Sequence, residues 1–156
     1  MDPVVRNIGA ADFEREREFV EGLSPRTAYQ RLMSPRKPSL EELHRWTDID
    51  RSREGVATIT VEGREQQVGV ARYVLDGADG DADLAIVISD GWQGRGLGKR
   101  LLSALIDLAR QSGIKRLVGS TLSENRGMLE LAGRLGFQRS KDSGTAFVTL
   151  LKLTLQ

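Results

Sequence analysis

A glycine-rich segment at residues 93–99 constrains the fold more than any other part of this chain. It reads Gln93-Gly94-Arg95-Gly96-Leu97-Gly98-Lys99 and lies between an apolar run, 84–88, and a stretch whose leucines recur at helical spacing. The first turn of a helix has N–H groups without partners and the positive end of the helix dipole. Glycines let a bulky anion approach the backbone closely. The segment therefore predicts a phosphate or pyrophosphate cradle between a strand and a helix.

Two well-known glycine-rich loops do not fit these residues. A P-loop ending at Gly98-Lys99 needs a glycine where Gln93 stands and a serine or threonine where Arg100 stands. A dinucleotide fingerprint needs a third glycine where the chain has Lys99 or Leu101. The pattern that does fit is Q/R-x-x-G-x-G in the order strand, turn, helix.

The elements around this segment follow from hydrophobic period and turn residues. The sequence predicts strands at 4–8, 56–61, 68–75, 84–88, 116–122 and 145–153, and helices at 10–22, 24–33, 39–46, 97–112 and 125–135. The stretch 76–83 is acidic and contains glycine, which predicts a loop, whereas the run 84–88 is apolar throughout, which predicts a strand buried on both faces. Because no repeat or long linker divides the chain, the sequence predicts one mixed α/β domain.

Composition excludes several classes of function. Lys and Arg number 23 and Asp and Glu 22, so the net charge of +1 argues against a nucleic-acid partner. The absence of cysteine and the single histidine, His44, argue against disulfides, a cysteine nucleophile and a metal site. No run approaches the roughly 18 apolar residues of a membrane span, and no signal peptide follows Met1. We therefore expect a cytoplasmic protein with no membrane partner.

Two segments together resemble the GNAT superfamily of N-acetyltransferases. The pattern at 93–98 is similar to its acetyl-CoA signature, and Asn125–Phe137 resembles its second cofactor-contacting helix, N-x-x-A/M…L-G-F. Residues 23–31 and 41–50 are similar to the acetyltransferase domain of bacterial Pat-type protein lysine acetyltransferases. The resemblance covers 4–152. It implies a single GNAT domain over 1–156, monomeric or homodimeric, with an α/β (α+β) fold: a mixed, mostly antiparallel central sheet with splayed central strands, flanked by helices.

The resemblance also implies a binding site for acetyl-CoA as cosubstrate. The main chain of Ile88 would meet the pantetheine amides, and Asn125 and Met128 would lie near the pantetheine arm. Asn125 suits a helix N-cap equally well. The pyrophosphate would be held at Gln93, Gly94, Arg95, Gly96, Leu97, Gly98 and Lys99.

The implied chemistry is direct transfer of an acetyl group to an amine. A lysine amine has a pKa of about 10.4 and must lose a proton before it can attack. Asp83 is the candidate base, at the place where Pat-like enzymes carry a glutamate; the alternative is a solvated loop acid. The family's usual general acid is a tyrosine, and Ala132 takes its position, so we expect the thiolate to leave with a proton from water.

The acceptor is expected to be a protein lysine or a small basic amine. Acidic residues gather at 76–83 and 41–50, and their negative field would attract a cation. The competing hypothesis is a catalytically inactive, CoA-binding regulatory module, which the missing tyrosine favours.

Overall fold

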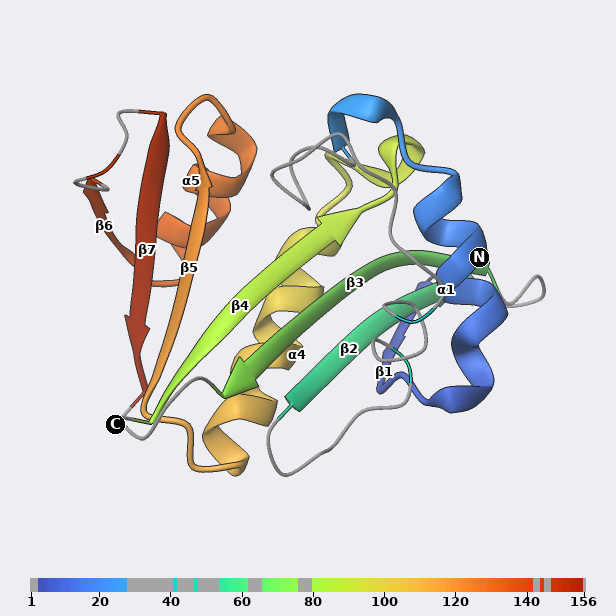
Figure 1. Ribbon diagram of the computed structural model, residues 1–156, viewed down its shortest axis with the longest axis horizontal. Coiled ribbons are helices and arrows are strands. Elements are labelled where there is room, and N and C mark those ends of the chain that lie inside the picture. The colour runs from blue at the N-terminus through green and yellow to red at the C-terminus, as the bar shows by residue number, and fades with distance from the viewer. Residues whose placement is uncertain are drawn as a thin grey trace.

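A computed structural model describes residues 3–27, 41, 47, 54–61, 66–75, 80–141, 144 and 147–155. Seven strands form one sheet in the order β1-β2-β3-β4-β5-β7-β6 (Figure 1). They are β1 Pro3–Arg6, β2 Glu54–Val61, β3 Gln66–Leu75, β4 Asp81–Ile88, β5 Arg116–Leu122, β6 Gln138–Lys141 and β7 Val148–Thr154. Neighbours pair antiparallel except for β4 and β5, which are parallel, so the expected mixed, mostly antiparallel sheet is confirmed.

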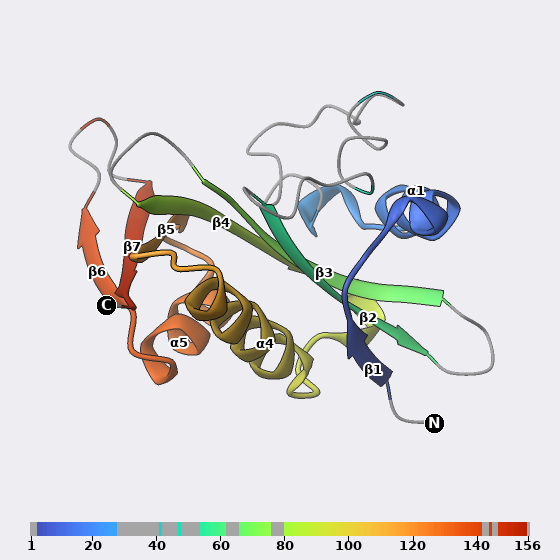
Figure 2. The ribbon, with the colours of Figure 1, turned by 90° about the horizontal axis from the view of Figure 1, so that it is seen from below.

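The helices cover both faces of this sheet. Figure 2 shows α1 (Phe13–Glu21) on one face and α4 (Leu97–Gln111) and α5 (Arg126–Arg134) on the other. Short 3-10 turns, η1 (Ala10–Asp12) and η2 (Asp90–Trp92), precede α1 and follow β4. Gly113 and Gly136 have φ of 78° and 94°, and each follows the end of a helix, as the sequence predicts.

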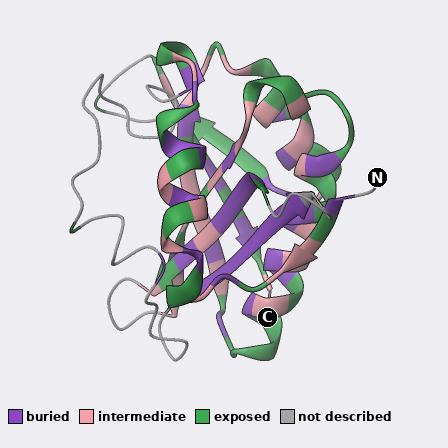
Figure 3. Cartoon of the chain, turned by 90° about the vertical axis from the view of Figure 1, so that its right-hand side faces the viewer, coloured by how far each residue is buried: buried purple, intermediate pink, exposed green. Residues whose placement is uncertain are grey.

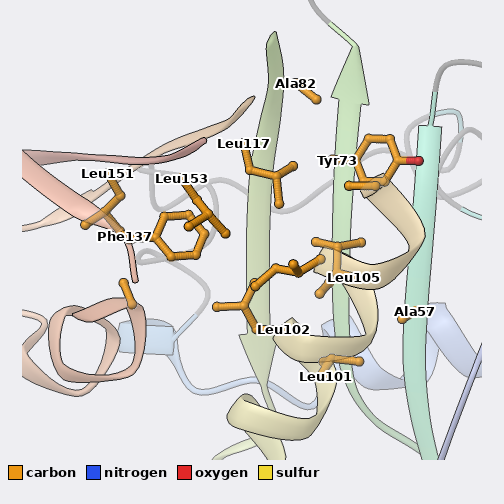
Figure 4. Close-up of a cluster of buried hydrophobic side chains, with 14 of the residues drawn as sticks. Ala57, Tyr73, Ala82, Leu101, Leu102, Leu105, Leu117, Phe137, Leu151 and Leu153 are labelled. Atoms are coloured by element: carbon orange, nitrogen blue, oxygen red, sulfur yellow. The ribbon is translucent and has the colours of Figure 1, made fainter. Parts of the chain in front are cut away.

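The main core lies between the sheet and α4. Leu101, Leu102 and Leu105 are fully buried, and Figure 4 shows them in one layer with Leu117 of β5 and Tyr73 of β3. Each such leucine contributes about 1.5–3 kcal/mol when it leaves water. Buried positions follow the strands and the inward faces of the helices (Figure 3). The leucine stripe thus fixes the helix that begins at the glycine-rich turn.

Two sequence-based predictions are wrong, and one strand was missed. Residues 81–83 belong to β4 rather than to a loop, because they pair with β3 and β5. Between 84 and 88 only Val87 is buried and Ala85 is exposed, because the strand borders an open gap. The edge strand β6 was not predicted, since its four residues are all exposed and show no apolar alternation. Most of the second and third predicted helices lies outside the described residues.

An ion-pair cluster holds the start of α1, and it predicts a pH-dependent stability. Asp12 is 4% exposed; it accepts hydrogen bonds from Arg6 at 2.6 Å, from Arg15, and from the Gly9 backbone at 2.9 Å. The hydrogen bond from Arg6 is the largest cause that lowers the pKa of Asp12 from 3.8 to about 2. Because the pKa of Asp12 is lower in the folded chain than in the unfolded chain, its charged carboxylate stabilises the fold above about pH 4. This stabilisation is lost as the pH falls through about 2.

We therefore expect Asp12→Asn to lower the free energy of unfolding at pH 7 by about 2 kcal/mol. The difference from wild type should shrink as the pH approaches 2. Urea unfolding at a series of pH values measures both effects. An equal loss at pH 7 and pH 2 would show that the packing of Asp12, and not its charge, stabilises α1.

Candidate active site

A gap opens between the two parallel strands in the middle of the sheet. β4 and β5 pair only at Asp81–Arg116, Ala82–Leu117 and Asp83–Val118, and beyond these pairs the strands diverge (Figure 1). A cavity of about 500 Å³ lies between the diverging strands. Its lining comes from Thr27, β4 (84–88), the turn (Trp92, Gln93, Gly94, Gly96, Gly98, Lys99), β5 (119–121), the start and inner face of α5 (Asn125, Gly127, Met128, Glu130, Leu131, Arg134) and Leu151.

The glycine-rich turn leads directly into the N-terminus of α4. Gly94 and Gly96 have φ of 76° and 81°, and a Cβ at either position would meet no atom within 4 Å. The backbone is therefore open where the first helical N–H groups lie, as an anion site requires. Leu97 and Arg95 do not line the cavity: the Leu97 side chain is buried in the core, and the Arg95 guanidinium lies 4.8 Å from the centre of the Trp92 ring.

The edge of β4 that faces the gap offers backbone hydrogen-bonding groups. Ile88 lies opposite Gly69, and Ser89 N donates to Val68 O at 2.8 Å, which makes Ile88–Gly69 a non-hydrogen-bonded pair. The N–H and C=O of Ile88 therefore point away from β3, toward the gap. The backbone groups of Ile86, two residues earlier, also point toward the gap, because the direction of N–H and C=O groups along a strand repeats every two residues. Ile88 was predicted from the sequence and Ile86 was not, although the two-residue repeat of a strand would have indicated Ile86 as well.

The other wall of the cavity comes from α5. Asn125 Oδ1 accepts from Met128 N at 3.2 Å, so Asn125 is the N-cap of the helix, and both residues also line the cavity. Helical spacing continues this wall to Leu131 and Arg134, which sequence reasoning did not name. A Cβ on Gly98 would lie 3.1 Å from Leu131 Cδ2, so the third glycine allows α4 and α5 to approach closely.

Asp83 lies at the narrow end of the gap. It is the last residue of β4 in register with β5, and Leu84, next to it, lines the cavity. Val87 of the same strand packs in the cluster that includes α1, so alternation places Asp83 on the α1 face of the sheet. Its side chain is exposed and stands on a strand rather than in the expected loop, and its role as the base stays a prediction.

Several other residues of the chain do not belong to the cavity lining or lie outside the described residues. Ala132 is 1% exposed in the core and does not line the cavity. Tyr73 is also buried in the core. His44 and most of the acidic residues expected near the acceptor lie outside the described residues. Asp81, which is described, forms an ion pair with Arg116.

Two further features are absent from the described part of the chain. No three His, Asp or Glu side chains within the described ranges gather as a metal site would require. Across the same ranges, no helix has the length and apolar character needed to cross a membrane.

Comparison with known proteins agrees with this geometry. Residues 5–138 match the acetyltransferase (GNAT) domain family. The chain is 34% identical over 155 residues to the acetyltransferase PA5475 of Pseudomonas aeruginosa, a match that covers 96% of this chain and 83% of the relative. It is 33% identical over 100 residues to an L-methionine sulfoximine/L-methionine sulfone acetyltransferase of the same species, covering 61% of this chain and 58% of the relative.

The solved GNAT domain of the S. lividans PAT protein superimposes with a TM-score of 0.89 at 28% identity, covering 98% of this chain and 90% of that domain. The resemblance to Pat-type enzymes is thus confirmed, and the matching family and the named relatives are acetyltransferases, which supports an enzyme rather than a regulatory CoA-binding module. GNAT acetyltransferases take their acetyl group from acetyl-CoA. The chain belongs to the GNAT family of N-acetyltransferases.

Proposed function

We propose that the acetyl group is transferred to a basic amine that arrives on the α1 face of the sheet, at the narrow end of the β4–β5 gap. The observation that carries this proposal is the position of Asp83. Its carboxylate stands on that face, beside the residue where the cavity ends. A pantetheine arm lying in the gap would place the acetyl group at its end close to an amine held beside this carboxylate.

The binding roles follow from which backbone groups are open. The N–H groups of the first turn of α4, with Gly94 and Gly96 before it, would hold the pyrophosphate. The gap-facing N–H of Ile88, whose C=O accepts from Gln93 Nε2, and the gap-facing groups of Ile86 would bond the pantetheine amides. Met128, on the facing wall, would pack against the pantetheine arm. Lys99 and Arg134, both on the cavity lining, would add positive charge for the phosphates.

The chemical step needs proton transfer at both ends: the attacking nitrogen loses a proton and the departing sulfur gains one. Acetyl-CoA supplies an acyl thioester, and the amine nitrogen forms the new C–N bond while the C–S bond breaks. Asp83 would take the proton of the amine, directly or through a water molecule. The described cavity lining contains no tyrosine, so the departing thiolate would take its proton from water.

The acceptor we favour is a protein lysine or a small basic amine. A carboxylate at the point of attack stabilises an ammonium before it is deprotonated, and opposes an anionic acceptor. The related P. aeruginosa enzyme named for methionine sulfoximine and methionine sulfone suggests the competing class, a free amino acid.

A comparative assay separates these acceptors. We expect free CoA release to give the highest kcat/KM with a lysine peptide or a polyamine. The KM of that acceptor should rise roughly threefold between low and high salt, because salt screens exposed charges. Methionine sulfone serves as the amino-acid arm, and acetyl-CoA alone gives the background. A higher kcat/KM for methionine sulfone, or a salt-independent KM for lysine, would contradict the proposal.

A further inference from the structure

A cluster of four polar side chains joins two turns that are far apart in the sequence. The turn after α1, at 24–27, lies beside the turn after β4, which contains η2 (Figure 1). Ser24 N donates to Asp90 Oδ1 at 3.3 Å across a separation of 66 residues. We name Ser24, Thr27, Asp90 and Gln93 the clasp.

On the α1 side, the clasp is built on the N-terminus of a helical turn. Ser24 Oγ accepts from Thr27 N at 3.2 Å, and the two hydroxyls lie 3.1 Å apart, so Ser24 caps this turn. Thr27 is 6% exposed and lines the cofactor cavity. The capped turn therefore holds the Thr27 hydroxyl in a fixed place at the cavity wall.

On the cofactor side, Gln93 connects that hydroxyl to β4. Its Nε2 donates to Ile88 O at 3.0 Å and lies 3.5 Å from Thr27 Oγ1. Gln93 is the first residue of the glycine-rich segment, and Asp90 begins η2 just before it. The clasp thus holds the turn from both ends, at Asp90 and at Gln93.

The turn has few other contacts to fix its shape. Asp90, Gly91 and 93–96 are exposed, and a Cβ at Gly91, Gly94 or Gly96 would meet no atom within 4 Å. Only Trp92 of this stretch packs against the core. A segment with so little burial takes its conformation from its hydrogen bonds. Hydrogen bonds from Ser24, with desolvation opposing them, lower the pKa of Asp90, so its carboxylate stays charged near neutral pH.

We propose that Asp90 and Thr27 are positioning residues for acetyl-CoA: they hold the turn between β4 and α4 so that its backbone N–H groups face the pyrophosphate. The segment after α1 would thereby set the affinity for the cofactor without contacting the reacting atoms. This inference rests on the proposal that the glycine-rich turn binds the pyrophosphate.

The test compares the affinity for acetyl-CoA in paired variants, measured by calorimetry. Asp90→Ala and Thr27→Val remove the hydrogen-bonding atoms, whereas Asp90→Asn and Thr27→Ser keep an acceptor oxygen and a hydroxyl. We expect the first pair to raise the Kd about tenfold and the second pair less than about twofold. At saturating acetyl-CoA the kcat of all four should stay within about twofold of wild type. Asp107→Ala, an exposed aspartate of α4, is the matched control.

The outcomes distinguish this inference from the proposal beneath it. An unchanged Kd in Asp90→Ala and Thr27→Val, with a large loss in Gly96→Val, overturns the clasp and leaves the pyrophosphate site standing. An unchanged Kd in all three overturns both. A lower kcat at saturation with an unchanged Kd would also overturn the inference, because the clasp would then support the fold or the acceptor instead.

Discussion

Gly96→Val is expected to raise the Kd for acetyl-CoA by at least about 10², to the limit of calorimetric detection. Gly96 has a φ of 81° at the N-cap of α4, and its side-chain position opens onto the cavity with no atom within 4 Å. A valine there would direct two methyl groups toward the phosphates and would disfavour the backbone angle that orients the first helical N–H groups.

Gly113→Val is a matched control for this variant. Gly113 follows the other end of α4 with a φ of 78°, and a Cβ there would also meet no atom within 4 Å. Both valines carry the same backbone strain, of about 1–2 kcal/mol. We expect similar losses of stability in the two variants and a loss of affinity only at Gly96. Equal affinities would place the pyrophosphate elsewhere.

Asp83→Asn is expected to lower kcat by about 10²–10⁴ and to leave the Kd for acetyl-CoA unchanged. The amide keeps the size of the side chain but cannot take a proton from the amine. The wild-type rate should rise with pH as the amine loses its proton. Steady-state kinetics over a range of pH, with a saturating amine, measures the difference.

Asp81→Asn serves as the control for Asp83. Asp81 is an acid of the same strand whose carboxylate pairs with Arg116 at the closed end of the gap. We expect its kcat to stay within about threefold of wild type, because its carboxylate is held by Arg116 and lies two residues, roughly 7 Å, along the strand from Asp83. If Asp83→Asn keeps the wild-type kcat across the pH range, Asp83 is not the base.

Local patterns predicted the half of the molecule that contains the proposed cofactor site. The glycine-rich turn, the leucine stripe of α4 and the cap at Asn125 are features of neighbouring residues, and the structure has each where the sequence places it. The assignment of 81–83 failed because acidic residues enter β4 only through pairing with β3 and β5, which no local pattern reveals. β6 was missed for the same reason.

The site also contains residues that only tertiary structure brings together. Thr27 reaches the cavity because the turn after α1 meets the turn after β4, and its own neighbours in the sequence predict nothing more than a capped helix. The gap itself arises where the β4–β5 register ends, after Asp83 and Val118. Strand divergence is a property of two distant segments, so the family resemblance was its only sign in the sequence.

The most direct test of this account is hydrogen exchange at individual backbone amides, with and without saturating acetyl-CoA. We expect the cofactor to slow exchange at Ile86, at Ile88 and along 94–99, where N–H groups face the gap or begin α4. Amides of β1 and β2, at the far side of the sheet, serve as the internal reference. Unchanged exchange at Ile86, Ile88 and 94–99, under conditions where acetyl-CoA is bound, would contradict the central claim that the β4–β5 gap is the cofactor site.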